Sequence, residues 1–207
     1  MKLENFHQKR IFTSNIDFVV KQLLKGEPVI FPTDTLYGIL ADAFNKKAVE
    51  RVYQIKNRNL QKPYIILLPD IEYINQFSVD LSSLETKLLK IEGITLVLNL
   101  KKPERFTYLH RGTGTLAFRI PKKGYIKALL NRIKIPLIAP SANPEGRPPA
   151  KNITQAIKYF KREIHVYFDK EKIKAGLPST ILKVCKGNIV VLREGKVKKE
   201  NIKISTE

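Results

Sequence analysis

Short apolar runs, each followed at once by polar residues, constrain the fold of this chain more than any other feature. They lie at residues 29–31, 64–68, 94–100, 116–120 and 136–139. Continuous apolar runs of this length are typical of strands buried on both faces. Three more runs follow near the end of the chain, at 166–168, 180–184 and 189–192.

Segments with helical periodicity separate these runs. One is expected to begin at Ser14, where Asp17 completes a capping signature, and to end at Gly26. Others are expected from about Asn45, from Ser82 or Ser83, near residues 126–130, and from a cap at Asn152. Because helices and strands alternate irregularly, the pattern predicts an α/β fold with a mixed sheet rather than a regular doubly wound one.

Length and composition predict a single domain over residues 1–207, with a loosely held tail from residue 196. The chain has 207 residues and is 43% hydrophobic, which is enough for one buried core. The single cysteine, Cys185, lies in an apolar run and is expected in the core, with no disulfide within the chain. The histidines at 7, 110 and 165 are scattered, so no metal site is expected.

The charge balance points to anionic partners. Lys and Arg number 38 against 19 Asp and Glu, a formal charge of +19, although a solvated lysine-rich surface explains such a balance equally well. The polar N-terminus does not suggest a signal peptide, and no run approaches the roughly 18 apolar residues of a membrane span. A cytoplasmic protein with no membrane contact is expected.

A hydroxyl-rich segment and a cationic segment bracket one predicted strand–loop–helix unit, at residues 28–63. The strand at 29–31 leads into Pro-Thr-Asp-Thr-Leu-Tyr-Gly at 32–38, and the helix leads to Lys56, Arg58 and Lys62. Side chains two residues apart share a face only in extended chain, so Lys56 and Arg58 can bind one anion only if the helix stops near residue 55. A frayed helix end with a solvated basic face is the alternative.

Other polar clusters also follow predicted strands directly. They are the segment 33–37, Arg119, the pair Ser141 and Asn143, and Arg193. Ligands of open α/β sheets bind beyond the carboxyl ends of strands, so these clusters are expected to meet in one crevice. The sequence has no G-x-S-x-G elbow, Walker loop or G-x-G-x-x-G fingerprint, which leaves side chains to neutralise a bound phosphate. The glycine-containing basic segment 101–115 is predicted as a surface loop that contacts phosphate or RNA.

Taken in order, these motifs resemble the YrdC-like threonylcarbamoyl-AMP synthase family. The resemblance rests on the motif at 32–38, Lys56-x-Arg58, Thr-Leu-Ala-Phe-Arg at 115–119, Ser141-x-Asn143, Ser-Thr at 179–180 and Arg193-x-Gly195, and spans residues 14–195. It implies a twisted mixed α/β sheet with flanking helices around a basic concave cavity. It also implies synthesis of L-threonylcarbamoyl-AMP from ATP, L-threonine and bicarbonate or CO2, with release of pyrophosphate.

The resemblance also assigns residues and partners. Lys56 and Arg58 match catalytic positions; ATP-binding positions are matched by Lys56, Arg58, Lys62, Thr115, Ser141, Asn143 and Arg193, and threonine-binding positions by Thr35, Arg119, Ala139 and Ser179. Mg²⁺ is expected to arrive with ATP, without a protein cage. The product is expected to pass to a tRNA threonylcarbamoyl transferase, and tRNA or double-stranded RNA is a candidate contact.

The chain departs from the family pattern at three places. Leu67 stands where some members have a histidine, Glu92-Gly93-Ile94 replaces a proline-glycine-proline segment, and Glu194 interrupts an Arg-Pro-Gly motif. The chain resembles the short form of the family. Two alternatives stay open: a double-stranded RNA-binding translation or ribosome-assembly factor, and a related carbamoyl transferase with another acceptor.

Overall fold

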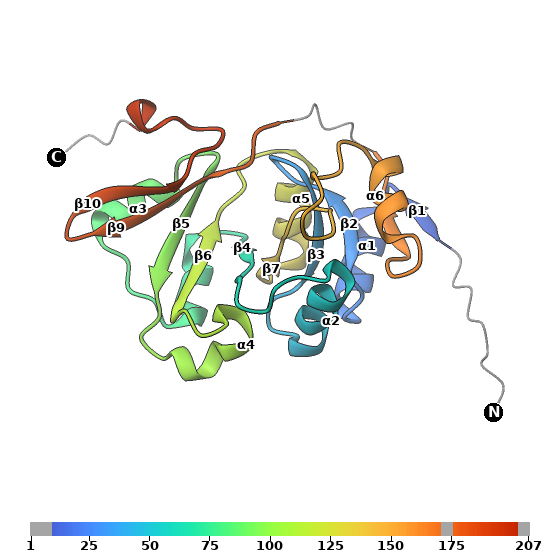
Figure 1. Ribbon diagram of the computed structural model, residues 1–207, viewed down its shortest axis with the longest axis horizontal. Helices are drawn as coiled ribbons and strands as arrows, with labels where there is room; N and C mark the ends of the chain where they lie inside the picture. The colour runs from blue at the N-terminus through green and yellow to red at the C-terminus, as the bar shows by residue number, and fades with distance from the viewer. Residues whose placement is uncertain (1–9, 171–175, 203–207) are drawn as a thin grey trace.

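A ten-stranded mixed sheet organises the protein (Figure 1). The computed structural model describes residues 10–170 and 176–202. The strand order is β1-β8-β2-β3-β7-β4-β6-β5-β9-β10. The strands are β1 Ile11–Thr13, β2 Val29–Pro32, β3 Tyr37–Asp42, β4 Ile65–Leu67, β5 Ile94–Asn99, β6 Thr115–Arg119, β7 Leu137–Ile138, β8 Val166–Phe168, β9 Thr180–Cys185 and β10 Asn188–Arg193. The sheet contains both parallel and antiparallel pairs, which confirms the predicted mixed sheet.

Six α-helices and three short 3₁₀ helices flank this sheet in the described residues. The α-helices are α1 Ile16–Leu24, α2 Lys46–Lys56, α3 Ser83–Leu89, α4 Thr107–His110, α5 Gly124–Ile133 and α6 Ile153–Phe160. The 3₁₀ helices are η1 Ile71–Phe77, η2 Pro103–Phe106 and η3 Lys199–Asn201. The predicted cap at Asn152 is confirmed. The helices expected from about Asn45 and from Ser82 or Ser83 are capped by Asn45 and Ser82, and Ser82 forms a full capping box with Glu85.

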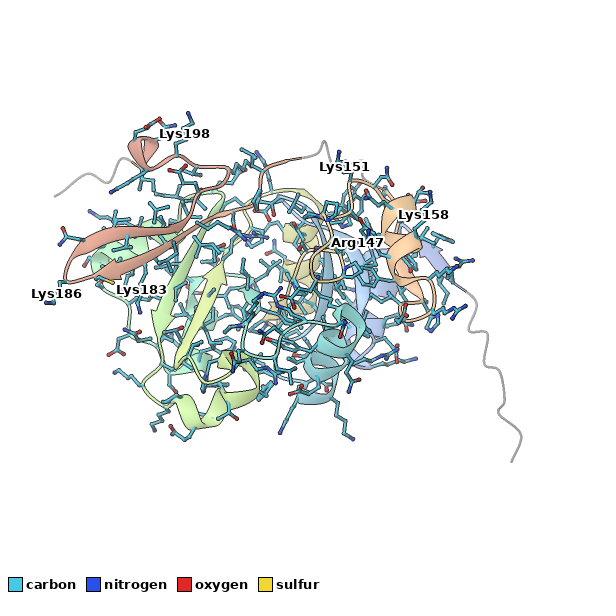
Figure 2. All side chains as sticks on the ribbon, viewed as in Figure 1. Arg147, Lys151, Lys158, Lys183, Lys186 and Lys198 are labelled. Atoms are coloured by element: carbon cyan, nitrogen blue, oxygen red, sulfur yellow. The ribbon has the colours of Figure 1, made fainter. Side chains whose placement is uncertain are left out.

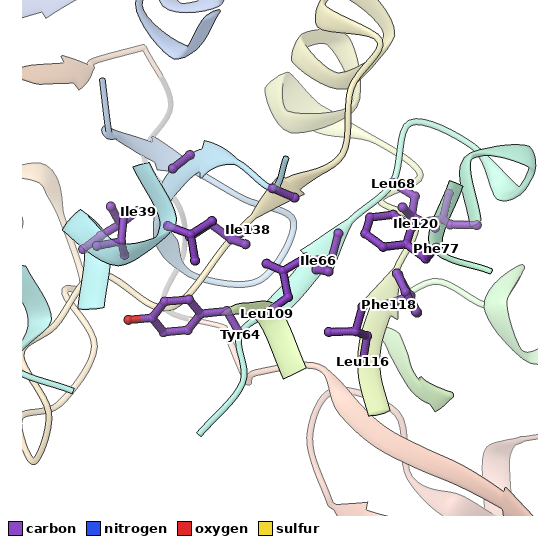
Figure 3. Packing of buried hydrophobic residues seen from close by; sticks show 14 of the residues in the cluster. Ile39, Tyr64, Ile66, Leu68, Phe77, Leu109, Leu116, Phe118, Ile120 and Ile138 are labelled. Atoms are coloured by element: carbon purple, nitrogen blue, oxygen red, sulfur yellow. The ribbon is translucent and has the colours of Figure 1, made fainter. Parts of the chain in front are cut away.

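The central strands are buried on both faces because two hydrophobic clusters sandwich them. Along β2, Val29 and Phe31 pack with α1 and α5, whereas Ile30 between them packs into the larger cluster beneath α2, α3 and α6. Figure 3 shows the larger cluster, where Ile66 and Ile138 lie on paired strands. Double burial explains why these strands appear as continuous apolar runs without alternation.

The predicted strand–loop–helix unit is wrong in one respect, because a second strand, β3, lies between its turn and its helix. β3 pairs antiparallel with β2, and Phe31 faces Gly38 across the pair. A Cβ at Gly38 would lie 3.2 Å from Thr33 Cγ2 and 3.3 Å from the Pro140 carbonyl oxygen. The glycine therefore lets the β2–β3 turn and the segment after β7 approach each other closely.

Three smaller expectations are also wrong. Asn15, not Ser14, caps α1, because its side chain accepts from the Phe18 N–H. The segment 101–115 is not a simple surface loop: η2 and α4 lie in it, with the apolar side chains of Phe106 and Leu109 buried. Cys185 is exposed at the end of β9 rather than buried in the core.

The tail is held at least as far as residue 202, contrary to expectation. Thr180 Oγ1 donates to the Val197 carbonyl at 2.6 Å and accepts from the Val197 N–H at 3.1 Å. Lys196 pairs with Glu92 at 2.7 Å. In the parts of the chain described, no helix is long and apolar enough to cross a bilayer.

Candidate active site

A cavity of about 530 Å³ lies where the predicted polar clusters meet. Its walls come from the β2–β3 turn, the segment after α2, the ends of β6, β7 and β10, the segment before α6, and the approach to β9. The site positions that line it are Thr35, Arg58, Arg119, Ala139, Ser141, Ser179 and Arg193. The expectation that polar strand ends converge on one crevice is therefore confirmed for the segment 33–37, Arg119, Ser141 and Arg193, but not for Asn143.

The hydroxyls of the β2–β3 turn are ordered by one threonine. Thr33 Oγ1 donates to the Leu36 carbonyl at 2.6 Å and lies 3.2 Å from Thr35 Oγ1. Because the single proton of Thr33 is already used, Thr35 is the donor in their mutual hydrogen bond. The remaining lone pairs of Thr35 are left to accept a hydrogen bond from a ligand in the cavity.

Arg119, at the end of β6, is a buried cation with one anionic neighbour. Its Nη2 lies 3.1 Å from Asp34 Oδ1, and the two side chains are 5% and 0% exposed. The contact is an ion pair without hydrogen-bond alignment, since no described group hydrogen-bonds to either Asp34 oxygen or to Arg119 Nε. Burial lowers the pKa of Arg119, and the Asp34 charge acts in the opposite direction.

Ser179 is held as a hydrogen-bond acceptor. Thr95 donates to its Oγ at 2.8 Å, and Arg193 Nη2 lies 3.3 Å from the same oxygen and 2.8 Å from the Ser179 carbonyl. Two donors on one hydroxyl oxygen leave the proton of Ser179 free for a ligand. Burial first, and then the nearby Arg119 charge, lower the pKa of Arg193.

Gly195 allows this corner of the site to form. A Cβ at this position would lie 2.2 Å from the Pro178 carbonyl oxygen and 2.6 Å from the carbonyl carbon of Ser179. No side chain fits there, so the backbone after β10 can pack directly on the segment that carries Ser179. The glycine is thus required by close approach.

Arg58 reaches the cavity and is positioned from two sides. Its Nε donates to the Lys62 carbonyl at 3.3 Å, and its guanidinium lies over the Tyr64 ring, 5.1 Å from the centroid. The helix before it ends at Lys56, and Asn57 adopts a left-handed conformation with φ of 48°. The predicted helix stop is therefore correct to within one residue.

Lys56 does not line the cavity. It is 1% exposed, and its Nζ donates to the Ser141 carbonyl at 2.5 Å and to the Asn143 carbonyl. Its own carbonyl accepts from the Glu145 N–H at 3.0 Å. Burial, together with the Arg58 charge, lowers the pKa of Lys56 to about 7, although Glu145 acts in the opposite direction. In this structure Lys56 anchors the segment 141–145.

Ser141 and Asn143 share a face, as their spacing predicts, but only Ser141 lines the cavity. Ser141 Oγ donates to Asn143 Oδ1 at 2.5 Å. The amide nitrogen of Asn143 donates to the carbonyls of Pro144 and Arg147, at 3.0 and 2.7 Å. Asn143 therefore shapes the turn that presents Ser141.

Lys62 is bound to a carboxylate outside the cavity lining. Its Nζ lies 2.5 Å from Glu145 Oε1, and the Asn59 N–H donates to Glu145 Oε2 at 2.6 Å. Glu145 thus joins the segment 57–62 to the segment 141–149, which contains Ser141. The Lys62 bond and the Asn59 N–H both lower the pKa of Glu145.

Thr115, which was expected to bind ATP, also lies outside the cavity lining, at the start of β6. Its Oγ1 bonds Thr113 Oγ1 at 3.2 Å, next to the ring of His110. His110 Nδ1 accepts from the N–H groups of Gly112 and Gly114, so its Nε2 is the donor to the Pro103 carbonyl. This neutral ring shapes the segment that precedes Thr115.

Sequence analysis assigned no role to three residues that shape the cavity. Thr33 and Asp34 belong to the motif at 32–38, and their positions between strand end and cavity could have marked them. Thr95 lies within an apolar run, and nothing in the sequence distinguishes it from a core residue. In the described residues no group of His, Cys, Asp and Glu could hold a metal, and the cavity lining includes none of these residue types.

Comparison with known proteins gives a consistent result. The model of the Sua5/YciO/YrdC family, described as "Telomere recombination", matches residues 21–195. A Methanocaldococcus jannaschii relative is 32% identical over 182 residues, covering 87% of this chain and 85% of that protein. The threonylcarbamoyl-AMP synthase of Bacillus subtilis is 30% identical over 87% of this chain and 53% of its own length.

A solved structure is also similar across most of the chain. The crystal structure of P. abyssi Sua5 complexed with L-threonine has a TM-score of 0.78 and 28% identity, covering 87% of this chain and 54% of that one. This chain therefore spans about half the length of the B. subtilis and P. abyssi relatives.

Proposed function

Because the chain belongs to the Sua5/YciO/YrdC family, we propose that it is an L-threonylcarbamoyl-AMP synthase. It would use ATP, L-threonine and bicarbonate or CO2, and release pyrophosphate. The names of its relatives and the threonine complex of the P. abyssi protein support this assignment. The observation that carries it is the convergence of hydroxyls and arginines from separate strand ends on one cavity.

The amino acid would bind to the hydroxyls and Arg119. Arginine binds a carboxylate through two parallel N–H bonds, and Arg119 lies in the cavity wall. Thr35 has lone pairs to accept from the substrate, while Ser179 has a free proton to donate. This pairing suits the hydroxyl, amine and carboxylate of threonine.

The reaction needs no protein nucleophile. The threonine nitrogen adds to the carbon of CO2, or to bicarbonate with loss of water, and forms a carbamate. A carbamate oxygen then attacks the α-phosphorus of ATP while the bond to the β-phosphate oxygen breaks and pyrophosphate leaves. The chain's contribution is positioning, together with stabilisation of the phosphate charge by Arg58.

Mg²⁺ would arrive on the triphosphate and neutralise part of its charge. The donor set of the cavity fits this reading, because hydroxyls and cations line it and carboxylates do not. For Lys62 to contact phosphate, it must exchange Glu145 for the nucleotide. Lys56 would act through the segment it anchors, which presents Ser141.

The product, a mixed anhydride, is consumed by a transferase that acts on tRNA. In Figure 2, Arg147, Lys151 and Lys158 lie in the right half of the view, and Lys183, Lys186 and Lys198 lie at the left. If binding of RNA to them is only electrostatic, it will weaken steeply and linearly in log salt and will not depend on sequence. Tight, salt-resistant binding of one RNA without ATP turnover would favour the binding-module alternative.

The test is pyrophosphate release from ATP and bicarbonate with threonine, serine and valine in turn. Serine lacks only one methyl group, so the enzyme should favour threonine over serine by only about 1 to 3 kcal/mol. Valine leaves the buried hydroxyls unpaired and should be rejected strongly. Valine used as well as serine would contradict the threonine assignment. Turnover with another acceptor in place of threonine would favour the related carbamoyl transferase.

A further inference from the structure

We infer that Asp34 is a positioning residue whose buried charge makes the Arg119 end of the cavity selective for a monocarboxylate over a phosphate. The inference takes its substrate, threonine, from the proposed function. Its physical basis is the buried ion pair between Asp34 and Arg119. Asp34 itself does not line the cavity, so it acts through Arg119.

The charges at this end of the cavity support the inference. Arg119 and Arg193 are close enough for one to lower the pKa of the other, and both line the cavity. Asp34 is the carboxylate that pairs with Arg119, and its side chain is 0% exposed. Two cations and one buried anion leave a net charge of about +1, which one carboxylate neutralises.

This balance matters because the same cavity is proposed to receive a triphosphate. Without Asp34, two buried arginines would present a charge of about +2, which suits a phosphate dianion. A unit charge several ångströms away, at the effective dielectric constant of a protein, changes ion binding by about tenfold or more. A zwitterionic amino acid gains less than a dianion does, because its ammonium group is repelled.

Asp34 therefore keeps phosphate out of the amino-acid end and directs the nucleotide toward Arg58. Asp34 is held within the hydroxyl-rich turn between Thr33 and Thr35, so the turn that accepts the substrate also carries the counter-ion of Arg119. No other described residue forms an ion pair with Arg119.

The experiment compares two anions as inhibitors with respect to threonine. With the wild-type chain, 3-hydroxybutyrate, which is threonine without its amine, should compete with threonine, and pyrophosphate should not. In Asp34→Asn, pyrophosphate should become competitive with threonine, and the ratio of its inhibition constant to the threonine KM should fall at least about tenfold. Asp42→Asn is the matched control, since Asp42 caps Phe44 outside the cavity lining and should leave both patterns unchanged.

Calorimetric titration of the same chains with inorganic phosphate separates this inference from the proposed function. Asp34→Asn should bind phosphate at least tenfold more tightly than wild type, and Asp34→Asn/Arg119→Gln should lose that gain. Absence of threonine-dependent turnover in wild type would remove the proposed function, while the titration would still decide the role of Asp34. Unchanged phosphate affinity in Asp34→Asn, or pyrophosphate already competing with threonine in wild type, would overturn the inference; the wild-type arm holds even if the variant does not fold.

Discussion

Replacement of Lys56 by methionine should remove a pH dependence from the stability of the folded chain. Lysine at this position is 1% exposed, and its pKa is lowered from 10.5 to about 7, mainly by burial. The folded chain therefore releases this proton near pH 7, whereas the unfolded chain holds it until about pH 10.5. Unfolding between these values takes up a proton, so a rise in pH favours the folded state.

The size of the effect follows from the same linkage. The slope reaches about 1.4 kcal/mol per pH unit once the folded lysine has lost its proton. Between pH 7 and 8.5 the stability of wild type should rise by about 1 to 2 kcal/mol relative to Lys56→Met. Methionine is close to lysine in length and cannot titrate, so contributions from other groups cancel in the difference.

Denaturant unfolding of both chains at several pH values measures this difference. A difference that stays flat from pH 7 to 8.5 would show that Lys56 keeps its proton in the folded state, and the reasoning from burial would fail. A steady-state assay adds a second readout. Because Lys56 holds the carbonyls of residues 141 and 143, Lys56→Met should lower both turnover and stability.

The remaining predictions concern side chains in or beside the cavity. Arg58→Ala should reduce pyrophosphate release by at least about 100-fold while changing stability by less than about 1 kcal/mol, because it removes a phosphate contact from a half-buried side chain; a normal rate would contradict the phosphate role. Arg119→Lys should raise the threonine KM at least about tenfold although the charge is kept, and an unchanged KM would exclude a bidentate carboxylate contact. Gly195→Ala should cost at least about 3 kcal/mol of unfolding free energy, because its Cβ would lie 2.2 Å from a backbone oxygen. Gly187 has open space around it, so Gly187→Ala should cost only about 1 kcal/mol. Equal losses in the two variants would refute the close-approach argument.

The location of the site was predictable because it depends on a rule of sheets rather than on side-chain detail. Arg119 and Arg193 end their strands, and Ser141 follows β7 closely, so a reading of strand ends was enough to bring them together. The buried strands were predictable because double burial gives continuous apolar runs, and the mixed sheet was predictable because helices and strands alternate irregularly along the chain. The strand β3, Tyr37–Asp42, was not predicted because it follows a turn directly and contains Gly38 and Asp42. Glycine and aspartate are depleted in strands and common in turns.

The roles of individual cations were not predictable, because a lysine's direction is decided by what surrounds its amino group. Lys56 and Arg58 are equivalent in the sequence pattern, but Asn57 between them is left-handed, and the two side chains point to different places. Lys56 binds backbone carbonyls of the segment 141–143, whereas Arg58 lines the cavity. Lys62 was likewise assigned to a nucleotide, whereas in this structure a carboxylate from a segment 83 residues away occupies it. The partners of both lysines lie at residues 141–145. Which cations can bind an anion is therefore decided only when the segment 141–145 has folded against the end of α2. A motif of this kind therefore defines which cations are near a phosphate site, while the tertiary fold decides which of them is free to bind it.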